Sequence, residues 1–74
     1  MQNKVHIGDY VSEELNNQER SMIWLSKQIE CDRSNLRKMI LSGKLNQDKL
    51  IKISKVLGKD FVQIFKQLAK EKLN

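Results

Sequence analysis

The chain has 74 residues and a net charge of +5; 39% of its residues are hydrophobic, 31% are charged, and one is a cysteine. This composition predicts one small domain with a thin core, of a size at which self-association is a common source of stability. It excludes an internal disulfide framework and a multi-cysteine metal site. No apolar run reaches the roughly 18 residues of a membrane span, and no signal-peptide pattern opens the chain, so we expect a soluble cytoplasmic protein.

Apolar residues recur at helical spacing along the chain, and polar residues or glycine interrupt them at intervals. The pattern predicts an all-α chain of five short helices without strands. The expected helices lie at about residues 6–18, 21–29, 32–42, 46–57 and 60–72. No repeat, linker or low-complexity tract separates them, so we expect residues 1–74 to form one domain.

Capping residues mark the expected helix boundaries. Four helices are preceded by a side chain that can accept a hydrogen bond from the first-turn backbone. These predicted N-caps are Ser21, Asp32, Asn46 and Asp60. Two glycines, Gly43 and Gly58, follow helices at positions where a left-handed C-terminal residue is favoured.

A single amphipathic pattern between residues 24 and 40 is interrupted at residues 30–32. Two helices joined by so short a turn meet at a steep angle, and the second can stand out from the body and enter a DNA major groove about 12 Å wide. Because Leu36, Met39 and Ile40 point inward, donor side chains on the opposite face of the second helix point outward. These donors are Arg33, Ser34, Arg37 and Lys38. Arg and Lys donate to the O6 and N7 acceptors of guanine, and Ser pairs with several bases.

Residues 22–41, MIWLSKQIECDRSNLRKMIL, resemble the helix-turn-helix of the Cro/phage-repressor-like (xenobiotic-response-element) family. That pattern has an apolar–small pair in its first helix, apolar residues before and within the turn, and two apolar anchors in its second helix. The matching residues are Leu25, Ser26, Ile29, Cys31, Leu36 and Met39. The stretch NQDKLIKISKVLGKDF resembles the family's fourth helix and the start of its fifth, so the resemblance covers about residues 6–66. It implies a five-helix lambda-repressor-like domain with a central helix-turn-helix.

The resemblance also implies a function: sequence-specific binding of double-stranded DNA by a transcriptional repressor from a bacterium or phage. The implied base-reading residues are Arg33, Ser34, Arg37 and Lys38. The implied phosphate contacts are Ser21, Lys27, Gly43, Lys44 and Asn46. A two-fold-related operator implies a homodimer, and we expect the outer part of an apolar stripe to meet the second subunit while the rest is core. That stripe is Phe61, Ile64, Phe65 and Leu68.

Five residues need separate interpretation. Glu30 stands where the family often has glycine, so either a non-glycine residue adopts the left-handed conformation or the turn differs. Met22 replaces a frequent phosphate-contacting glutamine. Cys31 matches an apolar turn position, which favours burial over redox chemistry. Trp24 either covers the core or belongs to a protein interface, and His6, without a second histidine, predicts no metal site.

The charge distribution agrees with a polyanionic partner. Residues 1–31 carry three basic and five acidic side chains, a net charge of −2, and residues 32–74 carry 11 basic and four acidic ones, a net charge of +7. Nucleic acid or an anionic membrane would suit this asymmetry, but basic residues on several faces weaken the membrane alternative. Lysines that only solubilise a small protein are the simplest alternative.

The sequence offers two alternatives to DNA binding. A helical protein-interaction module, antitoxin-like or a phage inhibitor, would use Trp24 and the apolar stripe at residues 61–68. An enzyme fits worst, because one His, one Cys and three Gly supply no nucleophile–base pair, metal cluster or phosphate-cradling loop. No cofactor or small-molecule ligand is predicted.

Overall fold

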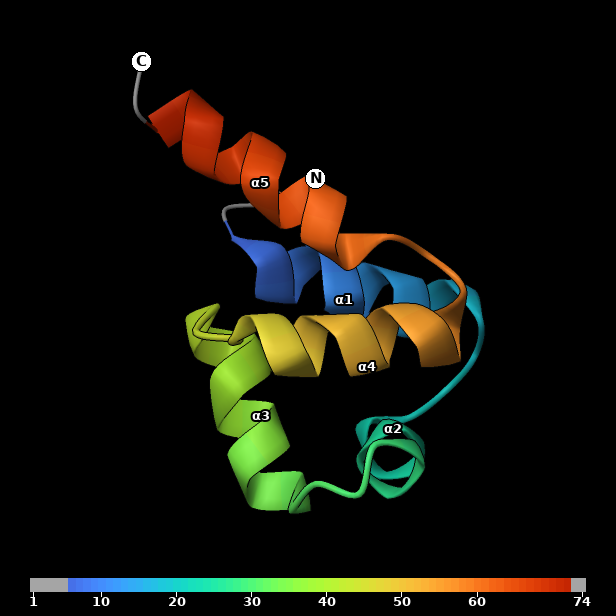
Figure 1. Cartoon of the computed structure of the whole chain (residues 1–74). Helices are drawn as coiled ribbons and strands as arrows, with labels where there is room; N and C mark the ends of the chain where they lie inside the picture. Colours follow the sequence, from blue (N-terminus) through green and yellow to red (C-terminus); the bar gives the residue numbers. More distant parts are fainter. Residues whose placement is uncertain (1–5, 73–74) are drawn as a thin grey trace.

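The computed structural model describes residues 6–72, which form five helices and the turns between them (Figure 1). The helices are α1 (Ile7–Asn17), α2 (Met22–Gln28), α3 (Arg33–Ser42), α4 (Gln47–Leu57) and α5 (Phe61–Lys72). The predicted all-α, five-helix architecture is confirmed. Every helix begins one residue after its expected start, because the residue at that start lies outside the helix.

The four predicted N-caps are present. In each, a side-chain oxygen accepts a hydrogen bond from the backbone N–H three residues later, at 2.8–3.1 Å. These caps are Ser21, Asp32, Asn46 and Asp60. Gly43 and Gly58 follow α3 and α4 with φ angles of 76° and 71°, as predicted for left-handed C-terminal residues. Helix boundaries in this chain therefore follow from local hydrogen-bonding chemistry.

One hydrophobic cluster joins all five helices. Its members are Ile7, Val11, Leu15, Leu25, Ile29, Leu36, Ile40, Leu45, Leu50, Ile53, Leu57 and Phe61. Trp24 is half-buried and packs against this cluster, with the Arg20 guanidinium 4.6 Å from its ring centroid. Of the two alternatives for Trp24, the structure therefore supports a covering role over the core.

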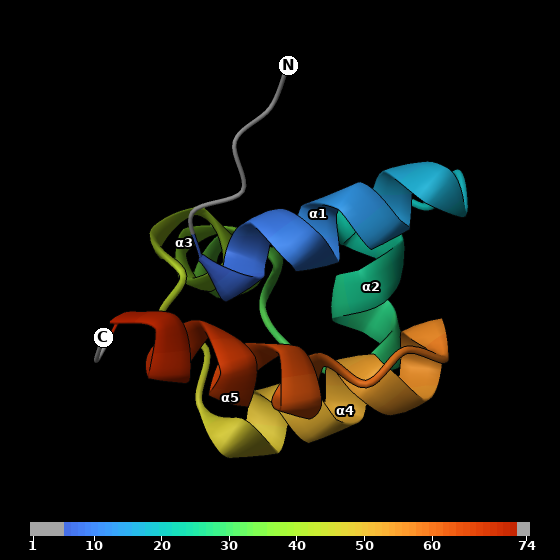
Figure 2. The same ribbon diagram turned by 90° about the horizontal axis from the view of Figure 1, so that it is seen from above.

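Helices α3 and α5 pack against different sets of neighbours. It packs against α1 and α2, whereas α5 packs against α4 and α1. In Figure 1, α2 is viewed nearly along its axis while α3 lies in the plane of the page, so the two helices cross steeply. Figure 2, seen from above, shows α4 and α5 side by side and α3 nearly end-on beyond α1. No helix within residues 6–72 combines the length and apolar character that crossing a bilayer requires.

Candidate nucleic-acid interface

The N-terminal part of α3 carries the four predicted base-reading residues. Leu36 and Ile40 of the same helix are 0% and 1% exposed, and Met39 is half-buried against the core. These contacts anchor α3 to the body. The predicted donors are all exposed: Arg33, Ser34, Arg37 and Lys38. The structure therefore leaves accessible, in the first turns of one helix, the side chains that the sequence singled out.

An open cleft of about 480 Å³ lies between the start of α2 and the first turns of α3. Its lining residues are Ser21, Met22, Ile23, Arg33, Ser34 and Arg37. Three of the four predicted reading residues thus share a concave surface with Ser21, one of the predicted phosphate contacts. Guanidinium groups next to apolar side chains suit the mixed chemistry of base edges, which combine hydrogen-bond acceptors with the thymine methyl group.

Sequence reasoning missed Ile23 as a member of this surface. Its side chain is 45% exposed and lines the cleft beside Arg33 and Ser34. The available signal was its position: Ile23 is a large apolar residue outside the inward stripe formed by Leu25 and Ile29. Because single exposed apolar side chains are common on protein surfaces, this signal alone does not identify a binding site.

The turn between α2 and α3 is made without glycine. Glu30 has a φ angle of 52°, so the first of the two alternatives for this position holds: a non-glycine residue adopts the left-handed conformation. That conformation costs roughly 1–2 kcal/mol for an ordinary residue. The turn is secured by the backbone N–H of Cys31, which donates to the Ser26 carbonyl at 2.9 Å. Cys31 is half-buried against the core, as its match to an apolar turn position predicts.

The predicted phosphate contacts are distributed over several places. Ser21, Lys27, Lys44 and Asn46 are exposed, and Gly43 is half-buried. Ser21 and Asn46 use a side-chain oxygen as a helix cap, which leaves the Ser hydroxyl hydrogen and the Asn amide able to donate to phosphate. Ser21 shares the cleft with the reading residues, whereas Lys44 and Asn46 follow the opposite end of α3 and Lys27 lies on α2.

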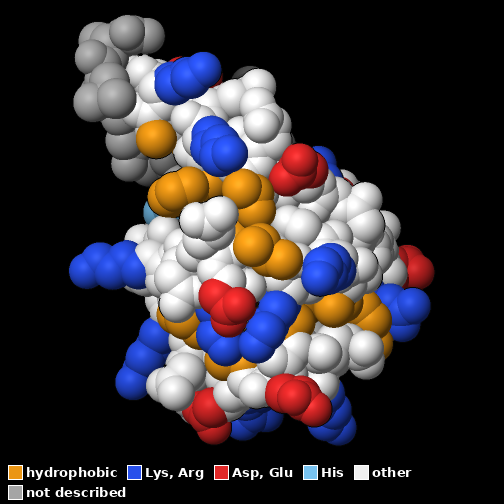
Figure 3. Space-filling view, in the orientation of Figure 1, with side chains coloured by type: hydrophobic (Ala, Val, Ile, Leu, Met, Phe, Trp, Pro, Cys, Tyr) orange, Lys and Arg blue, Asp and Glu red, His pale blue; other side chains and the backbone are white. Residues whose placement is uncertain are grey.

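Basic side chains are spread widely over the surface. In Figure 3 they project from several elements, including the lower left, where Figure 1 places α3. Two ion pairs engage lysines elsewhere: Lys52 with Asp48 at 3.6 Å, and Lys59 with Glu14 at 3.5 Å. Both partners of the Lys52–Asp48 pair are exposed, and a pair of this kind contributes little to stability. The distribution favours long-range attraction of a polyanion in addition to any specific contact.

The apolar stripe on α5 divides into core and surface. Phe61 is 0% exposed and belongs to the core, so its side chain is not available to a partner. Ile64 and Leu68 are half-buried against the core, and Phe65 is 41% exposed. Figure 3 shows hydrophobic side chains gathered along α5, where it passes above α4, with basic side chains beside them. Phe65 is therefore the most exposed member of the stripe.

No family model, curated protein or solved structure matches the chain. In the part of the chain that the structure describes, no three His, Cys, Asp or Glu side chains gather where they could hold a metal ion. The strongest assembly of functional side chains is the donor-rich surface of α3 with its adjoining cleft.

Proposed function

We propose that this chain is a sequence-specific double-stranded DNA-binding transcriptional regulator that reads the major groove with α3. One observation carries the proposal: four exposed donor side chains lie in the N-terminal part of a helix that buried Leu36 and Ile40 anchor to the body. A single α-helix fits a major groove about 12 Å wide. The steep crossing of α2 and α3 agrees with the geometry implied by the resemblance to the Cro/phage-repressor-like family.

The exposed residues divide into two roles in this proposal. Arg33, Arg37 and Lys38 donate to guanine O6 and N7, and Ser34 pairs with neighbouring base edges. Lys27, Lys44 and the capping residues Ser21 and Asn46 contact phosphates, which fixes the register of α3 without selecting a sequence. Contacts of this second kind supply most of the affinity and make it fall with salt.

The proposed regulator acts as a homodimer on a two-fold-related operator, in a bacterial or phage repressor working in the cytoplasm. Phe65 supplies the exposed apolar group for the second subunit, with the half-buried Ile64 and Leu68 beside it. Half-sites one helical turn apart, about 34 Å, follow from this type of assembly.

A second candidate is a helical protein-interaction module without a DNA target. The observation that favours it is the same exposed Phe65, at 41%, together with Ile23 at 45% on α2. Exposed large apolar side chains are common features of protein-binding surfaces. In this alternative, the donors on α3 serve only to keep the helix solvated.

Salt titration of binding to a random DNA duplex separates the two candidates. A DNA-binding protein shows measurable affinity at low salt, and the logarithm of its binding constant falls by about 0.9 per phosphate contact for each tenfold rise in salt. Fluorescence anisotropy of a labelled duplex measures this slope. Absence of affinity at low salt would favour the interaction module.

Two lysine variants test whether the salt dependence comes from the proposed phosphate contacts. Lys44→Ala is expected to weaken binding to all sequences similarly and to reduce the salt slope by about 1. Lys70→Ala, which removes an exposed lysine from α5, is expected to leave the slope nearly unchanged. Equal slopes for the two variants would show that Lys44 makes no phosphate contact.

A further inference from the structure

The cleft beside the first turns of α3 combines two kinds of side chain. Met22 and Ile23, from the start of α2, form an apolar wall, and Arg33 and Arg37, from α3, supply guanidinium groups. Two serines complete the lining, and none of the described residues that line this cleft is acidic. Hydrogen-bond donors therefore stand beside apolar surface with no carboxylate to neutralise them.

Ile23 presents apolar surface on a fixed stretch of backbone. Its side chain is 45% exposed, whereas Leu25 of the same helix is buried in the core. The Ser26 hydroxyl donates to the Ile23 carbonyl oxygen at 2.7 Å, and Ser21 caps the helix two residues before Ile23. A β-branched side chain in a helix has one strongly preferred rotamer, so Ile23 loses little conformational entropy when it contacts a ligand.

The guanidinium groups of the cleft are available to an incoming ligand. Arg33 and Arg37 lie four residues apart, so their side chains are neighbours on α3. Both residues are exposed, and within residues 6–72 neither makes an ion pair. Like charges at this spacing destabilise a helix slightly, and hydrogen-bond acceptors in the cleft would relieve the repulsion. In charge, the cleft is therefore complementary to the acceptor groups of a polyanion.

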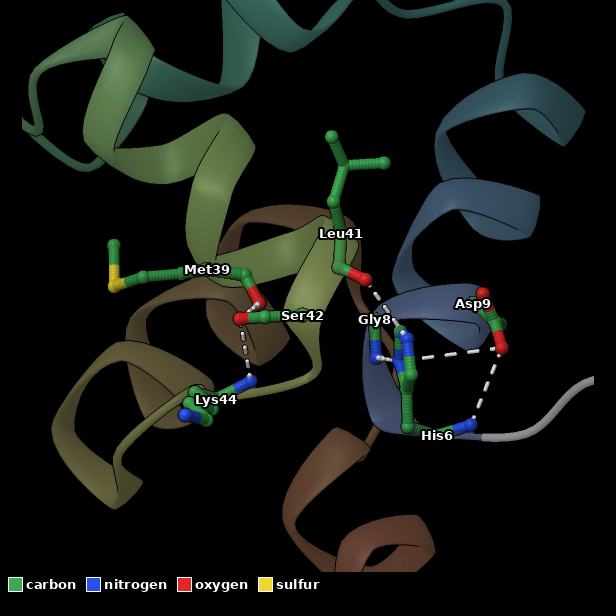
Figure 4. A network of polar contacts seen from close by, with 7 residues as sticks. All are labelled: His6, Gly8, Asp9, Met39, Leu41, Ser42 and Lys44. Atoms are coloured by element: carbon green, nitrogen blue, oxygen red, sulfur yellow. Dashed lines mark hydrogen bonds and ion pairs between the residues drawn. The ribbon is translucent and has the colours of Figure 1, made fainter.

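The helix that carries these arginines is held in place at its far end (Figure 4). The Nε2 atom of His6 lies 3.0 Å from the Leu41 carbonyl oxygen, and its Nδ1 accepts a hydrogen bond from the Gly8 backbone N–H at 3.1 Å. A Cβ atom added at Gly8 would collide with the Ile40 carbonyl oxygen, so the backbones of α1 and α3 are in close contact. The α3 wall of the cleft is therefore positioned before any ligand binds.

Among the four bases, thymine matches this combination of side chains best. In the major groove, thymine presents the O4 acceptor next to its 5-methyl group, whereas cytosine presents an amino donor and no methyl group. Purines present no methyl group there. Arg33 has five N–H donors, so after a bidentate contact to guanine O6 and N7 it can still donate to O4 of an adjacent thymine. The methyl group of that thymine then faces the apolar wall.

We propose that the cleft recognises a thymine through its 5-methyl group, and that Ile23 is the residue that determines this specificity. The inference rests on the proposed function, because it requires the first turns of α3 to lie in the major groove. The exposure of Ile23 alone identifies no site; its place in one cleft with two guanidinium groups does. Because Arg33 both lines the cleft and reads guanine, the thymine lies next to that guanine. Base reading thereby extends from α3 to α2.

Removal of one methyl group from the DNA is the first test. The duplex that wild type enriches from random DNA is resynthesised with deoxyuridine in place of each thymidine in turn, which keeps O4 and the pairing with adenine. We expect wild-type affinity, measured by fluorescence anisotropy, to fall about threefold to fivefold at one position per half-site, the effect of one methyl-sized contact. That position should neighbour the guanine whose selection depends on Arg33. Equal affinity for every substituted duplex would overturn the inference.

Protein variants locate the contact. Ile23→Ala is expected to bind the thymine duplex about threefold to fivefold more weakly than wild type and to make no distinction between thymine and uracil. Ile51→Ala is the matched control, because Ile51 is an isoleucine on α4 with a similar exposure, 39%. It should retain the full wild-type distinction. Persistence of the distinction in Ile23→Ala, or its loss in Ile51→Ala, would overturn the assignment of Ile23.

5-Methylcytosine separates the methyl group from the rest of the thymine edge. It carries the same methyl group but presents an amino donor where thymine presents O4. A cytosine–guanine pair in place of the thymine–adenine pair is expected to weaken binding more than uracil does, and methylation of that cytosine should recover only the methyl contribution. Equal affinity for thymine and 5-methylcytosine would overturn the choice of thymine as the occupant of the cleft.

The proposed function and the thymine contact fail in different ways. If wild type binds duplex DNA but does not distinguish uracil from thymine, the inference is overturned and the proposed function stands. If wild type binds no duplex at low salt, the proposed function is overturned, and the thymine contact with it. Circular dichroism verifies that each variant is folded, and the uracil measurement on wild type needs no variant.

Discussion

The two ends of α3 are attached in different ways. At its C-terminal end, Gly8 allows the backbone of α1 to touch the backbone of α3, and His6 bridges the two helices. At its N-terminal end, a short turn through Glu30 leads to the Asp32 cap, and exposed side chains follow at once. Close backbone packing therefore marks one end, whereas exposed side chains at the other end begin as soon as the turn is complete.

The packed end of α3 determines where the helix lies, whereas the exposed end carries the side chains that can meet a partner. The packed end has no space for an added atom at Gly8, so it fixes where the helix sits on the body. The other end has Arg33 and Ser34 exposed beside a cleft, so it can meet a partner without unpacking the core. We expect substitutions at the packed end to change stability most, and substitutions at the exposed end to change binding most.

The largest effect is expected from Gly8→Ala. The added methyl would force α1 and α3 apart, and overpacking of this kind destabilises by about 3 kcal/mol. Urea denaturation measures the free energy of unfolding. Ser12→Ala, at an exposed position of the same helix, is the control and should change stability by less than about 0.5 kcal/mol. Equal stability of Gly8→Ala and wild type would contradict the close approach of the two helices.

A smaller effect is expected at the exposed end from Asp32→Ala. The substitution removes the acceptor for the Asn35 backbone N–H, which lies 3.1 Å from Asp32 Oδ2. Loss of an N-cap typically costs about 1 kcal/mol. Asp32→Asn retains a capping oxygen and should stay close to wild type in the same urea experiment. If both variants lose the same stability, charge rather than capping is the contribution of Asp32.

The smallest effect, of opposite sign, is expected from Glu30→Gly. Glycine relieves the left-handed backbone but adds entropy to the unfolded chain, for a net gain of about 0.5 kcal/mol. Glu30→Ala removes the same charge while keeping Cβ, so it should show no such gain. A matching gain in both variants would assign the effect to the carboxylate instead of the backbone.

Local features of this molecule were predictable from the sequence, and contacts between distant segments were not. The caps at Ser21 and Asn46 depend on residues three positions away, so a pattern of residue types reveals them. The His6–Leu41 contact joins residues 35 positions apart and depends on how α1 and α3 pack. For the same reason, the sequence predicted that the α5 stripe divides into core and an outer part, but not that Phe61 is core while Phe65 is exposed.

In the candidate site, too, some features were predictable from local sequence and others depended on how the helices pack. The exposure of Ser34 and Lys38 followed from helical spacing, because they lie away from buried Leu36 and Ile40. The exposure of Arg33 and Arg37 did not, because these residues share the spacing of the buried pair. The cleft was not predictable in this way, since it depends on the crossing of α2 over α3, which brings Ile23 beside Arg33. The left-handed conformation of Glu30 was one of two alternatives, and only the folded turn distinguishes them.

In-vitro selection of binding sites from random duplex DNA tests the central claim most directly. Wild type is expected to enrich one two-fold-related sequence containing guanine at the positions read by Arg33 and Lys38. The double variant Arg33→Ala/Lys38→Ala is expected to lose that preference while keeping salt-dependent, non-specific affinity. A control variant, Lys66→Ala/Lys70→Ala on α5, should enrich the wild-type sequence. Enrichment of that same sequence by the Arg33/Lys38 variant would contradict the assignment of α3 as the base-reading helix.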